Sequence, residues 1–241
     1  MTAARPRTVI LALVLGAMNA TRSAADDDPR IEPGHDPGGI AIAILADGFD
    51  YTKPDLAAVL ARDGEGEAIA WDTIGENGHP FHAESQGTDT ARAATAHGGV
   101  RIVMVRVDRT NAASLARGIA FAAQTPAKIV FAAHPLEKPA ARDVLAAAAR
   151  KFEQLLFVAP HPGKTDSVGT EKADEIANLI LIENSADGLA PAHAVARVLG
   201  CGSGMPVGEM TGAEHKRAFL ERFEAAATAC EPERKPGSEQ K

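Results

Sequence analysis

Short apolar runs alternate along this chain with alanine-rich segments of helical periodicity, and this alternation constrains the fold more than any other feature. The runs "IVMVRV" (102–107) and "KIVFAA" (128–133) are nearly continuous in apolar character, as expected of strands that are covered on both faces. Strands that alternate with helices in this way form parallel sheets. We therefore predict an α/β fold: a doubly wound, mainly parallel sheet with helices on both faces.

The same pattern gives the approximate bounds of each element. The predicted strands are residues 40–46, 68–71, 101–107, 128–133, 155–159 and 179–182. The predicted helices are residues 88–96, 112–124, 139–152, 190–199 and 213–228. In an open α/β sheet the ligand site lies beyond the carboxyl ends of the strands, so the residues that follow each strand are the first candidates for function.

The two ends of the chain differ from this central region. Residues 1–25 hold two arginines, a short apolar run and a stretch of small residues, which predicts an export signal that is cleaved after Ala25. The alternative is a retained membrane anchor, although such an anchor needs about 20 apolar residues. Residues 26–39 are acidic and rich in Pro and Gly, which predicts a linker. We expect one domain over residues 40–230 and a flexible tail over residues 231–241.

Export would place the mature chain in the periplasm or outside the cell, where disulfides form. We expect the only two cysteines, Cys201 and Cys230, to pair there, with two separate thiols as the alternative. A net charge of -7 and an aromatic content of 4% argue against nucleic acid as a partner, because they supply neither a basic surface nor stacking side chains. We also expect no membrane contact after cleavage, since no later segment is apolar enough to cross a bilayer.

Carboxylates and imidazoles follow several of the predicted strands. Asp47, His134 and His161 follow the first, fourth and fifth strands, and Asp187 lies beyond the sixth. Because these strand ends meet at one edge of the sheet, we expect the four side chains in one cleft. Such a ligand set suits zinc, which leaves a metal-assisted hydrolase open. We favour the alternative of structural histidines, and we predict neither a metal nor another cofactor.

Six sequence blocks, in order, resemble the subtilisin-like serine proteases. They are "IAILADGFDYTKPDL" (42–56), "AWDTIGENGHPFHAESQGTDTA" (70–91), "GGVRIVMVRV" (98–107), "ASLARGIAFAAQTPAKIVFAAHP" (113–135), "LLFVAPHPG" (155–163) and "SADGLAPAHAVARVLG" (185–200). The resemblance spans roughly residues 40 to 200 and implies the subtilisin-like fold in a trimmed form.

The resemblance also implies that the catalytic triad of the family is replaced. The catalytic aspartate of the family falls on Ala46, its histidine on Gln86 and its nucleophilic serine on Asp187, while the oxyanion asparagine falls on Pro162 or Gly163. Alanine cannot orient a base, glutamine cannot take up a proton near neutral pH, and a carboxylate would repel a developing oxyanion. Together with the predicted export signal, the resemblance thus implies an exported pseudoprotease that binds an unidentified protein or peptide or has a structural role.

Other functions stay open at this point. One is a serine-type endopeptidase that uses displaced residues: Asp47, one position after Ala46, and Ser185. Another is the metal-assisted hydrolase described above. In a third, the domain keeps a peptide-binding cleft and so sequesters substrates or inhibits an active relative.

Overall fold

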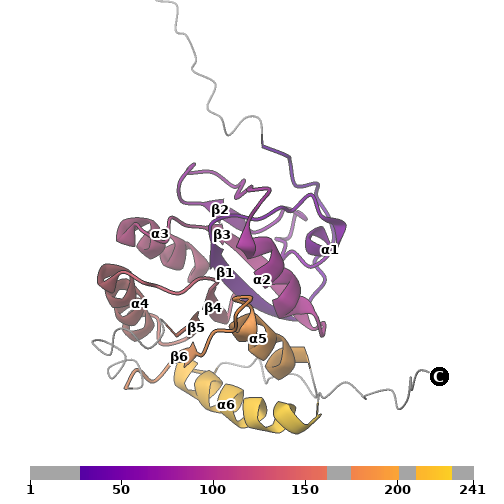
Figure 1. The fold of residues 1–241 in the computed structure, drawn as a ribbon. Helices are drawn as coiled ribbons and strands as arrows, with labels where there is room; N and C mark the ends of the chain where they lie inside the picture. Colours follow the sequence, from indigo (N-terminus) through magenta and orange to yellow (C-terminus); the bar gives the residue numbers. More distant parts are fainter. Residues whose placement is uncertain (1–27, 162–174, 201–209, 230–241) are drawn as a thin grey trace, which may run out of the picture.

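The computed structural model describes residues 28–161, 175–200 and 210–229 (Figure 1). Cys201 and Cys230, the predicted export signal and the predicted tail lie outside these ranges. Six strands and six helices lie within them. The strands are β1 (Ile40–Ala46), β2 (Ala70–Asp72), β3 (Val100–Arg106), β4 (Ile129–Ala132), β5 (Leu156–Pro160) and β6 (Leu179–Ile182). The helices are α1 (Pro54–Ala57), α2 (Gln86–Thr95), α3 (Ala112–Ala122), α4 (Pro139–Lys151), α5 (Ala190–Gly200) and α6 (Gly212–Ala229). Of these helices, none is both long and apolar enough to span a membrane.

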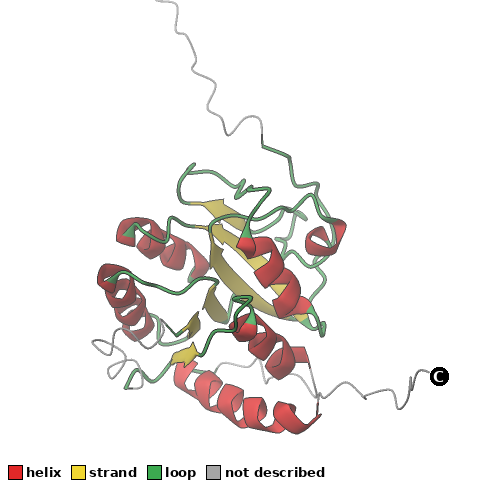
Figure 2. Ribbon diagram, viewed as in Figure 1, coloured by secondary structure: helices red, strands yellow, loops and turns green. Residues whose placement is uncertain are grey.

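The six strands form one parallel sheet in the order β2-β3-β1-β4-β5-β6 (Figure 2). Strand β1 pairs with β3 on one side and with β4 on the other, and all seven of its residues are buried. A strand in this central position needs apolar side chains on both faces, which explains its unbroken sequence IAIAILA. The predicted doubly wound α/β fold with a parallel sheet is confirmed.

Successive residues of β1 point to opposite faces of the sheet and enter two separate cores. Ile42 and Ile44 pack in the core under α2, α5 and α6, whereas Ala43 and Leu45 pack in the core under α3 and α4. Figure 1 shows the two sets of helices on either side of the sheet. Each buried isoleucine or leucine contributes on the order of 1.5–3 kcal/mol relative to an exposed one. The sheet is therefore held from both faces.

The crossover through α2 has the opposite hand to the crossovers through α3 and α4. The connections β2–α2–β3, β3–α3–β4 and β4–α4–β5 all step in the same direction across the sheet. However, α2 packs on one face, and α3 and α4 pack on the other. Because parallel crossovers are right-handed in about 98% of cases, one of these two hands is the rare left-handed one.

Local sequence signals set where the helices begin. Ser85 is extended, and its side chain accepts a hydrogen bond from the main-chain N–H of Gly87, so α2 starts at Gln86, two residues before the predicted start. Asn111 caps α3 in the same way, through Ala113 and Ser114. Pro139 is the first residue of α4, where a missing N–H costs nothing.

Residues 28–39, which the sequence analysis assigns to a linker, form an N-terminal strap that contains no helix or strand. Asp36 accepts hydrogen bonds from the main-chain N–H groups of Gly38 (2.7 Å) and Arg62 (2.9 Å), and it pairs with the guanidinium of Arg101. At the other end of the strap, the Tyr51 hydroxyl donates to the carbonyl oxygen of Pro29 at 2.7 Å. The strap is thus fixed to the domain at both ends.

Candidate functional site

An aspartate and a histidine meet at the carboxyl edge of the sheet. Asp47 is the first residue after β1, and His134 is the second residue after the neighbouring strand β4. The Nε2 atom of His134 lies 3.4 Å from Oδ1 of Asp47. The imidazole is buried, whereas the Asp47 side chain is 45% exposed. The His134 Nε2 atom itself is shielded from solvent and makes no hydrogen bond of good geometry. The accessible group of this pair is therefore the carboxylate.

Ser85, the cap of α2, holds the same carboxylate from a second side. Its hydroxyl donates to Oδ1 of Asp47 at 2.8 Å and also contacts the carbonyl oxygen of Gly48. The close contact with the His134 imidazole, and after it the hydrogen bond from Ser85, keep the pKa of Asp47 far below its usual range although burial opposes them. A carboxylate with such a low pKa is a weak base, so Asp47 is suited to remaining ionised rather than to abstracting a proton.

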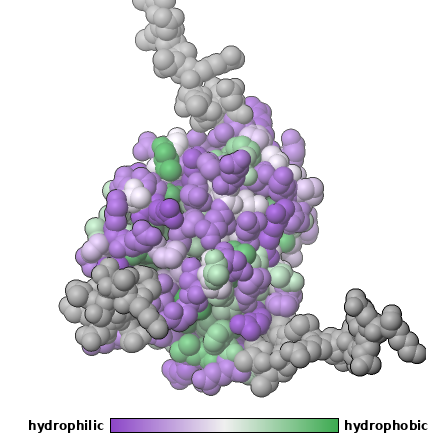
Figure 3. Space-filling view, in the orientation of Figure 1, coloured by the Kyte–Doolittle hydropathy of each residue, from purple (hydrophilic) through white to green (hydrophobic). Residues whose placement is uncertain are grey.

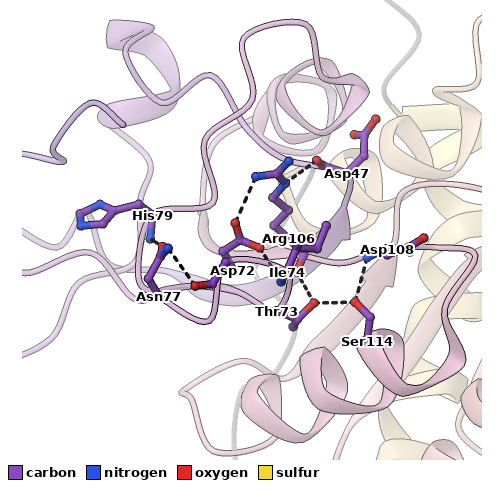
Figure 4. A network of polar contacts seen from close by, with 10 residues as sticks. Asp47, Asp72, Thr73, Ile74, Asn77, His79, Arg106, Asp108 and Ser114 are labelled. Atoms are coloured by element: carbon purple, nitrogen blue, oxygen red, sulfur yellow. Dashed lines mark hydrogen bonds and ion pairs between the residues drawn. The ribbon is translucent and has the colours of Figure 1, made fainter. Parts of the chain in front are cut away.

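Arg106, the last residue of β3, holds the main chain at Asp47 but not its carboxylate (Figure 4). The Nε–H of Arg106 donates to the carbonyl oxygen of Asp47 at 3.0 Å, and its guanidinium pairs with Oδ2 of Asp72 at 3.1 Å. The side chain of Asp72 is only 3% exposed, so the charge of Arg106 is balanced inside the protein. Figure 4 shows the Asp47 carboxylate pointing away from this guanidinium.

Further polar contacts fix the segment after β2. Oδ1 of Asp72 accepts the N–H of Ile74 at 2.7 Å, and the hydroxyls of Thr73 and Ser114 lie 2.6 Å apart (Figure 4). Ser114 also accepts the N–H of Asp108 at 2.9 Å, which ties α3 to the end of β3. Each of these polar groups therefore has a hydrogen-bond partner, and the contacts fix the positions of the ends of β2 and β3.

The three positions at which the resemblance puts a catalytic triad lie close together. Ala46 is the last residue of β1, Gln86 is the first residue of α2, and Asp187 lies in the loop between β6 and α5. A Cβ atom at Gly87 would be 2.6 Å from Cβ of Ala46, and a Cβ atom at Gly188 would be 2.4 Å from Nε2 of Gln86. The carboxyl edge of the sheet thus brings α2 and the loop before α5 into contact.

Asp187 and Ser185 form the cap of α5. Oδ1 of Asp187 accepts the Ser185 hydroxyl and the N–H of Leu189, the latter at 3.0 Å. These two bonds, the first being the stronger, lower the pKa of the exposed Asp187 carboxyl. The Ser185 oxygen accepts the N–H of Ala190 at 2.9 Å. The Ser185 proton therefore goes to a carboxylate, and in the described part of the chain this hydroxyl has no hydrogen bond to an imidazole.

His161 is the residue that follows β5. Its Nδ1 atom is 4.0 Å from Oε1 of Glu183, whose side chain is 83% exposed. Of the four candidates predicted to share one cleft, the structure brings Asp47 and His134 into contact, while His161 contacts Glu183 and Asp187 contacts Ser185 and Leu189. Within residues 28–161, 175–200 and 210–229, no three His, Cys, Asp or Glu side chains gather closely enough to hold a metal ion.

Ser85 and Arg106 were not predicted as neighbours of Asp47. Ser85 carried a partial signal, since serine is a typical N-cap, but its contact with Asp47 depends on how α2 packs against the end of β1. Arg106 carried none, because a pairing across two strands depends on sheet register. Pro162 and Gly163, the positions assigned to the oxyanion asparagine, lie outside the described residues.

Comparison with known proteins gives structural likenesses alone. No protein-family model matches the sequence, and neither does any curated protein. Among solved structures, the chain is similar to a cold-adapted subtilisin-like serine proteinase, with 13% identity and a TM-score of 0.49 over 69% of this chain and 76% of that one. It is also similar to the patellamide maturation protease PatG, with 16% identity and a TM-score of 0.35 over 80% and 78% of the two chains. At these values, neither likeness carries an argument about function.

Proposed function

We propose that this chain is an exported, subtilisin-like domain that does not cleave peptide bonds and that acts by binding a protein or peptide. One observation carries the proposal: Ala46, Gln86 and the loop of Asp187 adjoin one another at the carboxyl edge of the sheet, where the resemblance calls for a triad. The positions adjoin, but Ala46 supplies no carboxylate to orient a base, Gln86 is no titratable base, and Asp187 supplies no nucleophilic hydroxyl.

The geometry argues against a displaced serine protease. Ser185 is engaged with Asp187 and with the start of α5, and Ser85 is buried and donates to Asp47. A serine needs an imidazole as its immediate partner in order to become a nucleophile. At Asp47 the carboxylate stands between the hydroxyl and the imidazole, which is the wrong order for proton transfer from serine to histidine.

A metal-assisted hydrolase has less support than the binding function. Such an enzyme needs three protein ligands around the ion and an open position for water. Asp47 and His134 would supply two ligands, and a third would have to come from a residue that the structure does not place beside them.

A digestion experiment tests the absence of proteolysis. The purified protein is incubated with an unfolded substrate protein, and the products are analysed by mass spectrometry beside the variants Ser185→Ala and Ser85→Ala. We expect no cleavage by any of the three samples. Cleavage by the wild-type protein that either substitution abolishes would overturn the proposal, and so would cleavage that persists in both variants and stays with the protein through further purification.

Export is the other part of the proposal, and residues 1–25 are its basis. Expression of the full chain in a bacterial host, followed by fractionation and N-terminal sequencing, tests it. We expect a mature chain that begins at Asp26 in the exported fraction. A chain that keeps its first residues and stays in the cytoplasm would contradict this part alone.

A further inference from the structure

We infer that Asp47 is the acceptor of a binding site for a basic side chain, the guanidinium or ammonium of an arginine or lysine in a bound peptide. This inference rests on the proposed binding function and names the chemistry that the site selects. The inference starts from the half-exposed carboxylate of Asp47, which contacts the side chains of Ser85 and His134.

The Asp47 carboxylate is held in place with one oxygen left over. Oδ1 receives the Ser85 hydroxyl and faces Nε2 of His134, whereas no other side chain of the described residues pairs with Oδ2. His134 is 6% exposed, and its Nε2 is aimed at this carboxylate without another partner. A buried polar atom without a hydrogen bond is unusual in a folded protein. It is explained if His134 serves to orient the Asp47 carboxylate for a ligand.

The cation that could have neutralised Asp47 is engaged elsewhere. Arg106 touches only the main-chain oxygen of Asp47, and its charge is matched by Asp72. Arg106 therefore does not neutralise the carboxylate, which contacts the His134 imidazole on its buried side and is 45% exposed to solvent. The pKa shift of Asp47 agrees with this, since it keeps the group ionised throughout the neutral range.

The surroundings favour a cation over other ligands. Asp187, a second ionised carboxylate, lies in the loop that contacts Gln86, the residue after Ser85. The whole chain carries a net charge of -7, which steers cationic ligands towards it. An ammonium or guanidinium needs one or two oxygen acceptors, which this edge provides, whereas a metal ion needs more ligands than the described residues gather.

Two matched peptides test this inference on the purified exported protein. They have the sequence Ala-Ala-X-Ala-Ala, with X either arginine or the uncharged norleucine, and binding is followed by the NMR signals of the Asp47 and Gly48 amides. Because a hydrogen bond to a charged group is worth more than a neutral one, we expect the arginine peptide to bind at least about tenfold more tightly than the norleucine peptide. Equal affinity, or no shift of these two signals up to millimolar arginine peptide, would overturn the inference.

Two substitutions assign the preference to Asp47. Asp47→Asn keeps the shape and the acceptor for Ser85 but removes the charge, and it should reduce arginine-peptide binding to the norleucine level. Asp108→Asn is the matched control, because Asp108 lies at the same edge of the sheet but accepts hydrogen bonds from Thr110 in its own turn. Retention of the arginine preference in Asp47→Asn would contradict the inference.

The peptide experiment separates this inference from the proposed function. If the peptides are cleaved, the non-proteolytic function fails whatever the preference is. If they stay intact and bind without preference for arginine, only the inference about Asp47 fails. Should Asp47→Asn not fold, as judged by circular dichroism, the comparison of the two peptides on the wild-type protein still decides the matter.

Discussion

Gln86 and Gly188 meet across the carboxyl edge of the sheet. A Cβ atom at Gly188 would lie 2.4 Å from Nε2 of Gln86, and Gly188 has a φ of +77°. This contact joins the first turn of α2 to the loop before α5, the two segments to which the resemblance assigns a catalytic histidine and a nucleophilic serine. The two segments are close enough for their side chains to act together in catalysis. The residues in contact there, however, are a glutamine and a glycine.

The contact between Gln86 and Gly188 predicts the effect of a methyl group. Gly188→Ala should destabilise the protein by about 1 kcal/mol or more, because a positive φ is strained for alanine and the methyl group displaces Gln86. For a domain of this size that corresponds to a fall in Tm of roughly 2–4 °C. Thermal unfolding followed by circular dichroism measures it. Gly64→Ala is the control, since nothing lies within 4 Å of a Cβ atom there; equal Tm values for the two variants would contradict the strained contact.

The buried ion pair of Asp72 and Arg106 predicts a larger loss of stability. Asp72→Ala leaves the guanidinium of Arg106 without its partner in a poorly hydrated place, and the expected cost is about 3 kcal/mol. Urea unfolding of the variant and the wild type measures the difference. Asp55→Ala removes the exposed pair with Arg92 and should leave the free energy of unfolding nearly unchanged. Similar losses of unfolding free energy in both variants would show that burial does not determine how much each ion pair contributes to stability.

His215 in α6 predicts how stability depends on pH. The side chain is fully buried, and neither ring nitrogen has a hydrogen-bond partner. Burial, and then the nearby charge of Lys128, lower the pKa of His215, while Glu214 opposes them. The neutral form is therefore favoured in the folded state. Above pH 6.5, the ordinary pKa of histidine, protonation of His215 does not reduce the free energy of unfolding. As the pH falls below 6.5, the unfolded chain binds a proton more readily than the folded one, and the free energy of unfolding falls by up to about 1.4 kcal/mol for each pH unit.

Urea unfolding at pH 7.5 and at pH 5.5 tests the role of His215. The wild type should lose stability between these values, and His215→Leu, which keeps an apolar side chain in the core, should lose less. His35→Gln, at an exposed position of the strap, should behave as the wild type does. An unchanged pH dependence in His215→Leu would assign the loss to other groups.

The N-terminal strap predicts a pattern of proteolysis. Burial alone would raise the pKa of Asp36, but hydrogen bonds from Arg62, Gly38 and Arg101 together lower it, so the carboxylate is part of the anchor. Asp36→Ala should speed tryptic cleavage after Arg30, which is exposed. The rate is followed by mass spectrometry. His35→Ala changes a neighbouring exposed side chain and should leave the rate as it is; equal rates in both variants would mean that Asp36 does not hold the strap.

The fold could be predicted in large part because buried strands carry their own signature. The predicted ranges 40–46 and 179–182 coincide with β1 and β6, and the start of α4 at Pro139 was also predicted. The anchoring of the strap was not visible, because Asp36 and Arg101 are 65 residues apart and only the fold brings them together. The hand of the crossover through α2 could not be predicted either, because it depends on which face of the sheet the helix packs against.

The candidate site could be predicted in part. Strand-end rules placed Asp47 and His134 at one edge of the sheet, and the structure pairs them. The same rules grouped His161 and Asp187 with them, and that part of the grouping stays a prediction. Asp187 turns to cap α5, and His161 faces Glu183.

The most direct test of the non-proteolytic account is exposure of the purified protein to a fluorophosphonate, which attaches covalently to activated serines. Intact-mass spectrometry reads the result, and an active serine protease treated in parallel shows that the reagent works. The account predicts no added mass, because no serine in the described part of the chain has an imidazole as its hydrogen-bond partner. Stoichiometric labelling of one serine, together with peptide cleavage that is lost when that serine becomes alanine, would contradict it.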